Sequence, residues 1–304
     1  MYTRIGNCLN HPSYFRYGFY FLLLISLVLN SVITQNDSNF YILYILAAVF
    51  LGIGFYNKPA WFIIFFTVLV VVCRFFLIPD FDPSIINFLV YLVTYLLITF
   101  ISLELMKYVQ KVKESQVELT MALANTLDSR DAYTLHHSEN VAKYAVKIAE
   151  EMKLSKHLCE HIRIGCLLHD IGKIGIPERI LNKKEKLTID EYNVIKNHPT
   201  IGYNIIKHVA TFNQNGVLDI VLHHHERYDG TGYPEGLKGD EIPLAARIVA
   251  VADSFDAMTS KRIYRDELEM EHTINEICKN KGTQFDPEVV DVFFNLLQTN
   301  GYKI

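Results

Sequence analysis

Cysteine is scarce in this chain and follows no pattern. The 304 residues hold five cysteines, which is an odd number, and no two of them have the CxxC spacing. Structural disulfide frameworks and thiolate zinc sites depend on such even, regular sets. The sequence therefore indicates neither, and it fits a reducing, cytosolic environment for the part of the chain that carries chemistry.

Basic residues do not outnumber acidic ones in this chain. The chain has 29 Lys and Arg against 33 Asp and Glu, and residues 1–103 account for only four of the basic and three of the acidic ones. This leaves 25 basic and 30 acidic residues beyond residue 103, a net charge of −5. Proteins that bind polymeric nucleic acid normally show a basic face. We therefore expect no such partner, whereas a small anionic substrate held by a few local cations remains open.

Charged residues are rare in residues 1–103 because long apolar stretches fill this part. Each stretch is near the roughly 20 residues that cross a bilayer core. The first has no small-residue cleavage site and three more follow it, which argues against a signal peptide. The sequence predicts a four-helix transmembrane region over 1–103, with spans at 17–33, 40–56, 60–78 and 85–103.

The loop charges predict the orientation in the bilayer, since Lys and Arg gather on the cytoplasmic side. The acidic residues of this region lie in the two predicted outer loops, 35–39 and 79–84, which are too short to fold into a sensory domain. Both termini should therefore be cytoplasmic. Arg74, one turn inside the third span, is expected to reach the interface by snorkelling and to be structural. The basic residues expected inside are Arg4, Arg16, Lys58, Lys107, Lys111 and Lys113.

Residues 104–128 read as a charged helix that links the membrane region to the rest. Its apolar residues recur at three- and four-residue intervals: Leu105, Val109, Val112, Leu119, Leu123 and Leu127. This spacing suits a parallel two-helix seam, and hence a homodimer through 104–128. A helix that packs on its own domain is the open alternative.

Runs of β-branched residues are scarce after residue 115, so we predict an all-α cytoplasmic domain over 115–304. Helix starts are signalled by Ser155, by a capping box of Thr188 with Glu191, and by Asp286 before Pro287. The predicted helices are 114–128, 136–152, 155–168, 188–196, 201–208, 217–224, 243–260, 269–280 and 287–298.

Histidines and acids concentrate between residues 167 and 234. Imidazoles and carboxylates together hold borderline divalent metals, so this region predicts a metal site for hydrolysis. A lone histidine on a helix is more often a core residue, and only an ordered set changes that reading. The ordered motifs are His137-Ser138, His169-Asp170-x-Gly-Lys173, His198-Pro-x-x-Gly202, His224-His225-Glu226-Arg-x-Asp-Gly230-x-Gly-Tyr-Pro234 and Ala252-Asp253-x-Phe-Asp256-Ala257.

From about residue 119 to 294 this set closely resembles the HD-GYP family of the HD phosphohydrolases, whose typical members hydrolyse the bacterial messenger cyclic di-GMP. The resemblance implies two divalent metals bridged by Asp170, with iron or manganese favoured by family precedent and zinc compatible by ligand type. Tyr133 stands where some members have a third-metal glutamate, so two metals are expected. One would be held by His137, His169 and Asp253, and the other by His198, His224 and His225.

The resemblance also implies the catalytic and substrate groups. A hydroxide bridging the metals would attack the phosphodiester phosphorus, with Asp170 and Lys173 as catalytic residues. Tyr233 would contact guanine. Lys183 lies in a loop, 182–186, that departs from the Lys-Pro-Gly often found in the family, which puts its substrate contact in doubt. The expected phosphate contacts are Arg262 and Arg265.

Together these features predict an enzyme in the bacterial inner membrane that converts cyclic di-GMP to linear pGpG, with onward hydrolysis to GMP left open. Its parts would be a transmembrane region (1–103), a linker helix (104–128) and a phosphohydrolase domain (115–304). Two alternatives stay open: a cyclic-dinucleotide sensor that does not hydrolyse, and an HD phosphohydrolase for another cyclic dinucleotide or a nucleotide phosphate.

Overall fold

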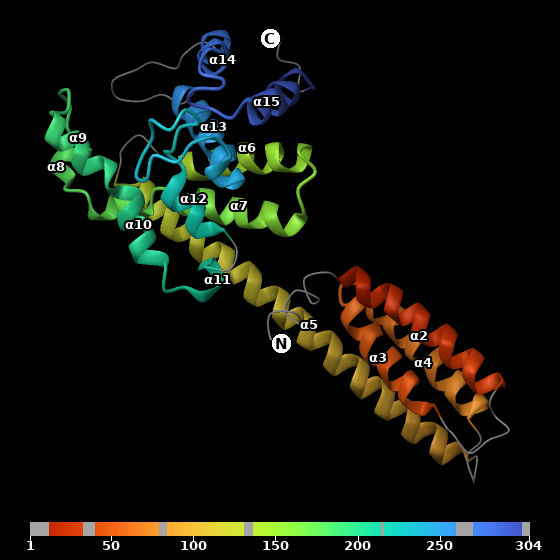
Figure 1. Cartoon of the computed structure of the whole chain (residues 1–304). Coiled ribbons are helices and arrows are strands. Elements are labelled where there is room, and N and C mark those ends of the chain that lie inside the picture. Colours follow the sequence, from red (N-terminus) through yellow and green to blue (C-terminus); the bar gives the residue numbers. More distant parts are fainter. Residues whose placement is uncertain are drawn as a thin grey trace. The chain divides into compact units, whose positions relative to one another are not determined.

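The computed structural model describes residues 12–32, 40–78, 84–130, 136–213, 216–259 and 270–299. These residues form helices and turns, with a single isolated bridge between Lys281 and Phe285 (Figure 1). The predicted all-α fold class is therefore confirmed. The chain divides into two compact units, Met1–Ser115 and Gln116–Ile304, each of which is described by itself.

The first unit packs α2 (Pro12–Val32), α3 (Tyr41–Gly54), α4 (Ala60–Leu77) and the first part of α5 (Ile85–Asp128) around one apolar core. A Cβ atom at Gly52 would lie 2.4 Å from the carbonyl oxygen of Thr99. A side chain there would collide with the backbone of α5, so glycine is what lets α3 approach α5 closely.

Helices of membrane-spanning length account for three of the four expected spans. α2, α4 and α5 are long and apolar enough to cross a membrane, but α3 has only 14 residues. At about 1.5 Å per residue it covers about 21 Å, which is less than a bilayer core of about 30 Å. Three helices of the described residues thus meet the length of a span, and the fourth helix of the bundle is shorter.

Two cations of this unit have defined partners. Arg16 donates to the carbonyl of Gly54 at 2.7 Å, so it lies beside the turn that carries Lys58. Arg74, which was expected to reach the membrane interface by snorkelling, is 8% exposed within the bundle, and its guanidinium carbon lies 3.4 Å from the Tyr91 ring centroid. Stacking on an aromatic ring keeps this cation inside the bundle.

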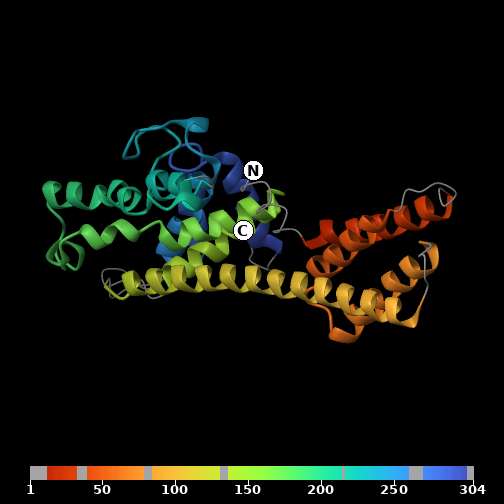
Figure 2. The same cartoon turned by 90° about the horizontal axis from the view of Figure 1, so that it is seen from below.

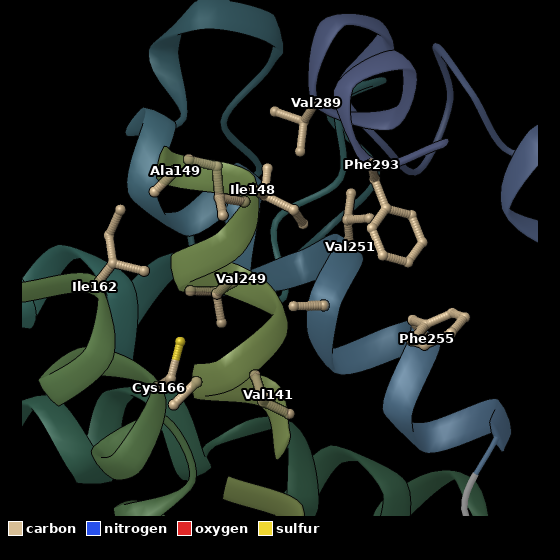
Figure 3. Close-up of a cluster of buried hydrophobic side chains, with 14 of the residues drawn as sticks. Val141, Ile148, Ala149, Ile162, Cys166, Val249, Val251, Phe255, Val289 and Phe293 are labelled. Atoms are coloured by element: carbon tan, nitrogen blue, oxygen red, sulfur yellow. The ribbon is translucent and has the colours of Figure 1, made fainter. Parts of the chain in front are cut away.

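The second unit contains the end of α5 and a cluster of shorter helices. α6 packs against α7, α13 and α15, and α12 packs against α7 and α10. Figure 3 shows the core between α6, α7, α13 and α15, with Val141, Ile162, Val249, Phe255 and Phe293 among its buried side chains. The elements after α5 are α6 (His137–Glu151), α7 (Lys156–Leu168), η1 (Ile171–Gly175), α8 (Glu178–Leu181), α9 (Ile189–Lys196), α10 (His198–Ile206), α11 (Ala210–Asn213), α12 (Val217–His223), η2 (Gly239–Glu241), α13 (Leu244–Thr259), α14 (Met270–Lys279) and α15 (Pro287–Thr299).

The predicted helix starts are confirmed. Ser155 accepts a hydrogen bond from the backbone of Leu158, Thr188 and Glu191 form a capping box, and Asp286 accepts from the backbone N–H of Glu288 at 2.7 Å. α10 begins three residues earlier than predicted, because Pro199 is compatible with the first turn of a helix. The short elements η1, α8, α11 and η2 were not predicted, since three to five residues show no helical period.

Candidate metal centre

The seven expected ligands come from helix ends and from one helix interior. His137 is the first residue of α6 and His198 the first of α10, whereas His169 and Asp170 follow α7. His224 and His225 follow α12, and Asp253 lies within α13. α6, α7 and α13 share one core, and α12 packs against α7, α10 and α13, so five separate segments of the chain bring their ligating side chains to one place.

The side chains form two groups. Within each group, all ligand atoms lie within 4.8 Å of one another. One group contains His137, His169 and Asp253, and the other contains Asp170, His198, His224 and His225. Asp170 connects the two, since its Oδ1 atom lies 3.2 Å from Nε2 of His198 and its Oδ2 atom lies 3.3 Å from Nε2 of His169. Its carboxylate faces both groups at once.

Four of the histidines are oriented by a second contact. In a neutral ring whose Nδ1 faces a carbonyl or carboxylate oxygen, Nδ1 carries the hydrogen and Nε2 keeps its lone pair. Metal-binding histidines are typically fixed in this way. The Nδ1 contacts are His137 to Asp256 Oδ2 at 2.6 Å, His169 to Cys166 O at 2.6 Å, His198 to Ile195 O at 2.8 Å and His224 to Val221 O at 3.0 Å.

This arrangement fits a bound cation. Nε2 of His198 and Nε2 of His224 lie 3.3 Å apart, and in the tautomer set by their Nδ1 contacts their lone pairs face each other. Such a contact is repulsive unless a proton or a metal cation lies between the atoms. Two nitrogen ligands bound at about 2.1 Å to one metal have a similar separation. Nε2 of His169 is also buried and makes no well-aligned hydrogen bond among the described residues, although Oδ2 of Asp170 lies 3.3 Å away.

The electrostatics of the second group favour ligation. Burial alone would raise the pKa of Asp170, but Lys173, whose Nζ atom is 2.6 Å from Oδ2, and His169 hold it well below its usual value. Burial lowers the pKa of His224 well below its usual value, and that of His225 to about 4. Metal ligation needs ionised carboxylates and neutral imidazoles, which is the state these shifts produce.

Asp256 orients one of the expected ligands, a role that the sequence motifs alone do not assign to it. It is 2% exposed and holds Nδ1 of His137. Burial by itself lowers the pKa of His137, but Asp253 and Asp256 outweigh it and raise this pKa to about 10. The available signal was spacing, because a residue three positions after Asp253 on a helix lies on the same face.

Glu226 holds the loop that follows the last two histidine ligands, and this role was not predicted from the sequence either. Its carboxylate is 3% exposed and accepts hydrogen bonds from three successive backbone N–H groups, those of Glu235, Gly236 and Leu237, at 2.7, 3.1 and 3.1 Å. A Cβ atom at Gly232 would lie 2.3 Å from the backbone nitrogen of Arg227. The 227–237 loop is therefore tied down at its end and admits no side chain at Gly232.

Of the expected substrate residues, Tyr233 lies beside the cluster. The ring centroid of Tyr233 lies 4.9 Å from that of His225. Nζ of Lys196 lies 5.0 Å from the Tyr233 centroid. Burial raises the pKa of Tyr233, so its hydroxyl stays protonated. Lys183 instead forms an ion pair with Glu191, at 2.6 Å. Tyr133, Arg262 and Arg265 lie outside the described residues.

Comparison with known proteins identifies the family of this chain. The HD domain family matches residues 121–289, more than half of the chain. The cyclic di-GMP phosphodiesterase response regulator RpfG of Xanthomonas campestris is 44% identical over 62% of this chain and 50% of its own length. The cyclic di-GMP phosphodiesterase of Thermotoga maritima is 46% identical over 55% and 45%, and 3'3'-cGAMP-specific phosphodiesterase 2 of Vibrio cholerae is 36% identical over 59% and 34%.

This chain thus spans half or less of the length of these relatives. The matched residues contain all seven side chains of the two groups. The chain belongs to the HD domain family, as its resemblance to the HD-GYP type predicts.

Proposed function

We propose that the second unit is a metal-dependent phosphodiesterase that hydrolyses cyclic di-GMP. The observation that carries this proposal is the pair of facing Nε2 atoms of His198 and His224, 3.3 Å apart and joined through Asp170 to a second group of ligands. Two adjacent ligand groups joined by one carboxylate could hold the closely spaced pair of metals that two-metal hydrolysis uses.

The cofactors in this proposal are two divalent cations, iron or manganese. His137, His169 and Asp253 would hold one, His198, His224 and His225 the other, and Asp170 would contact both. When bound, two cations supply an activated water and neutralise charge on the phosphoryl oxygens. The described ligands are nitrogen and oxygen donors without thiolates, which suits these metals.

The chain's own residues would position the substrate. The ammonium of Lys173 is partly exposed beside Asp170, so it can donate to a phosphate oxygen or to the leaving oxygen. Tyr233 offers a neutral hydroxyl and a ring face to a guanine base.

Further phosphate contacts are proposed outside the described residues. We propose Arg262 and Arg265 for this role, since two guanidinium groups suit a doubly anionic ligand. A substrate contact of Lys183 would compete with its ion pair to Glu191. The product of hydrolysis would be linear pGpG, and a second cleavage would give GMP.

The first unit would anchor the enzyme in the bacterial inner membrane with both termini in the cytoplasm. Three helices of membrane-spanning length support the anchor. Arg16 lies beside the turn that carries Lys58, so these two cations share one end of the helix bundle.

We also propose a homodimer through 104–128, because Leu105, Leu119 and Leu123 are exposed on α5. Sedimentation in detergent, with Leu119→Glu as the variant, tests this contact.

The activity is tested on the full chain, purified in detergent and loaded anaerobically with Fe²⁺ or Mn²⁺. Cyclic di-GMP, 3'3'-cGAMP and cyclic di-AMP are each incubated with the protein, and the products are separated by chromatography. The proposal expects pGpG from cyclic di-GMP and none with Asp170→Asn.

Two other outcomes favour the alternatives. Full metal occupancy and dinucleotide binding without turnover would indicate a sensor. Cleavage of 3'3'-cGAMP but not of cyclic di-GMP would indicate the other substrate, which is the one named in the V. cholerae relative.

A further inference from the structure

Among the described residues before it, the helix that carries His137 has no capping side chain of its own. α6 begins at His137, and the preceding residue, His136, has a left-handed backbone conformation and makes no side-chain capping bond. The first N–H groups of a helix lack partners within the helix, so a buried helix start needs acceptors from elsewhere. Because His137 is the first residue of α6, whatever satisfies this start also fixes the metal-facing imidazole.

The acceptor comes from α5. Asp128 is the last residue of α5 and is 4% exposed. Its Oδ1 atom accepts from the hydroxyl of Ser138 at 3.1 Å, and its Oδ2 atom accepts from the Ser138 backbone N–H at 3.4 Å. A carboxylate at this place also interacts favourably with the helix dipole. Asp128 thus does for α6 what an N-cap residue normally does, but from another helix.

The turn that follows α5 reaches the other side of the site. Arg130 donates to the carbonyl of Ile174 at 3.0 Å, and Ile174 directly follows Lys173 in η1. The carbonyl of Arg130 in turn accepts from the side chain of Asn182 at 3.2 Å. The end of α5 is therefore held between the segment of His137 and the segment of Lys173.

We propose that Asp128 is a positioning residue for His137: by capping α6 it sets the place of the imidazole in the group of His137, His169 and Asp253, and so sets the metal affinity of that group. This rests on the proposed metal function. α5 is continuous from Ile85 to Asp128, as both views show (Figure 1, Figure 2), and its first part has the length and hydropathy of a membrane span.

The test measures Mn²⁺ binding by the metal-free full chain in detergent, with Asp128→Ala as the variant. We expect two Mn²⁺ per chain in the wild type, and about tenfold or greater weakening of one of the two in Asp128→Ala, the usual effect of removing a group that orients a ligand. Asp128→Asn keeps an acceptor oxygen and should restore most of the affinity. Ser138→Ala, which removes only the hydroxyl contact, should give an intermediate loss.

Ser155→Ala is the matched control. Ser155 caps α7 through the backbone N–H of Leu158, at the opposite end of that helix from His169. Loss of this cap should lower Tm while both Mn²⁺ affinities stay at the wild-type values. If Asp128→Ala also lowers Tm without changing either affinity, Asp128 is only a structural cap and the proposal is overturned.

The Mn²⁺ titration and the hydrolysis assay test the positioning role of Asp128 and the proposed activity separately. A wild-type chain that binds two Mn²⁺ but hydrolyses no cyclic dinucleotide overturns the proposed activity alone, and the affinity ratio of Asp128→Ala still decides the positioning role. A wild-type chain that binds no Mn²⁺ overturns both.

Discussion

Asp256 and His137 are 119 residues apart in the chain, yet Oδ2 of Asp256 lies 2.6 Å from Nδ1 of His137 and both side chains are buried. The contact leaves Nε2 of His137 directed at Asp253, 3.1 Å away. The carboxylate therefore fixes both the tautomer and the direction of an imidazole that we propose as a metal ligand.

Replacing Asp256 with alanine should weaken metal binding at the group of His137 by about 10- to 100-fold, because the ring loses its orienting acceptor. The measurement is a Mn²⁺ titration of the full chain. Asp240→Asn is the control, since the Asp240 side chain is 88% exposed. Equal affinities in wild type and Asp256→Ala would contradict the orienting role.

Glu226→Gln should loosen the loop that carries Tyr233. The three N–H groups of residues 235–237 use both carboxylate oxygens, and glutamine has only one acceptor oxygen. We expect the free energy of unfolding in urea to fall by about 1–3 kcal/mol, and KM for the dinucleotide to rise more than kcat falls. Glu235→Gln, at an exposed side chain, should leave both unchanged. A normal KM in Glu226→Gln would show that the loop does not contact the substrate.

Gly172→Ala and Gly175→Ala form a matched pair in η1. A Cβ atom at Gly172 would come closer than any real contact to the carbonyl oxygen of His198 and to the backbone nitrogen of Gly202, which cannot move aside independently of α10. At Gly175 it would meet the Ile201 side chain at 3.0 Å. Gly172→Ala should therefore cost about 3 kcal/mol or more of stability, and Gly175→Ala less.

Metal content distinguishes the two variants further. Gly172 lies two residues after Asp170, and its Cβ would push against the residue that carries the His198 imidazole. Purified Gly172→Ala should contain less metal than Gly175→Ala when both are analysed by elemental analysis. Similar stability and metal content in the two variants would mean that η1 and α10 can separate without consequence.

His161 should make the metal-free protein less stable in acid. Burial lowers its pKa to about 4, and His157 beside it acts in the same direction. The unfolded chain, with a histidine pKa of about 6.5, binds the proton more readily. The stability contribution is thus complete above pH 6.5 and declines as the pH falls toward 4.

Urea denaturation of the wild type and His161→Gln at several pH values between 7 and 4 tests this. The variant should lose less stability over that interval than the wild type, whereas His208→Gln, at an exposed position, should follow the wild-type curve. Parallel curves for wild type and His161→Gln would show that His161 is not buried as a neutral group.

The local features of the fold were predictable. The capping box of Thr188 and Glu191 and the N-cap of Ser155 depend on residues three positions apart, so they can be read from the sequence. The same holds for the all-α class, since helical periodicity extends over whole segments. The chain also contains the histidines and acids in motif order, and their chemistry alone indicates a divalent metal.

The helices, the HD family membership and the chemical kind of the ligands thus follow from local patterns and from residue type. Four contacts depend instead on how the helices pack: Asp256 with His137, Glu226 with the loop of Tyr233, Asp128 with the start of α6, and Arg74 with Tyr91. The physical reason is that the direction of a side chain depends on how its helix packs. That packing is fixed by contacts between residues far apart in the chain, which no local pattern records.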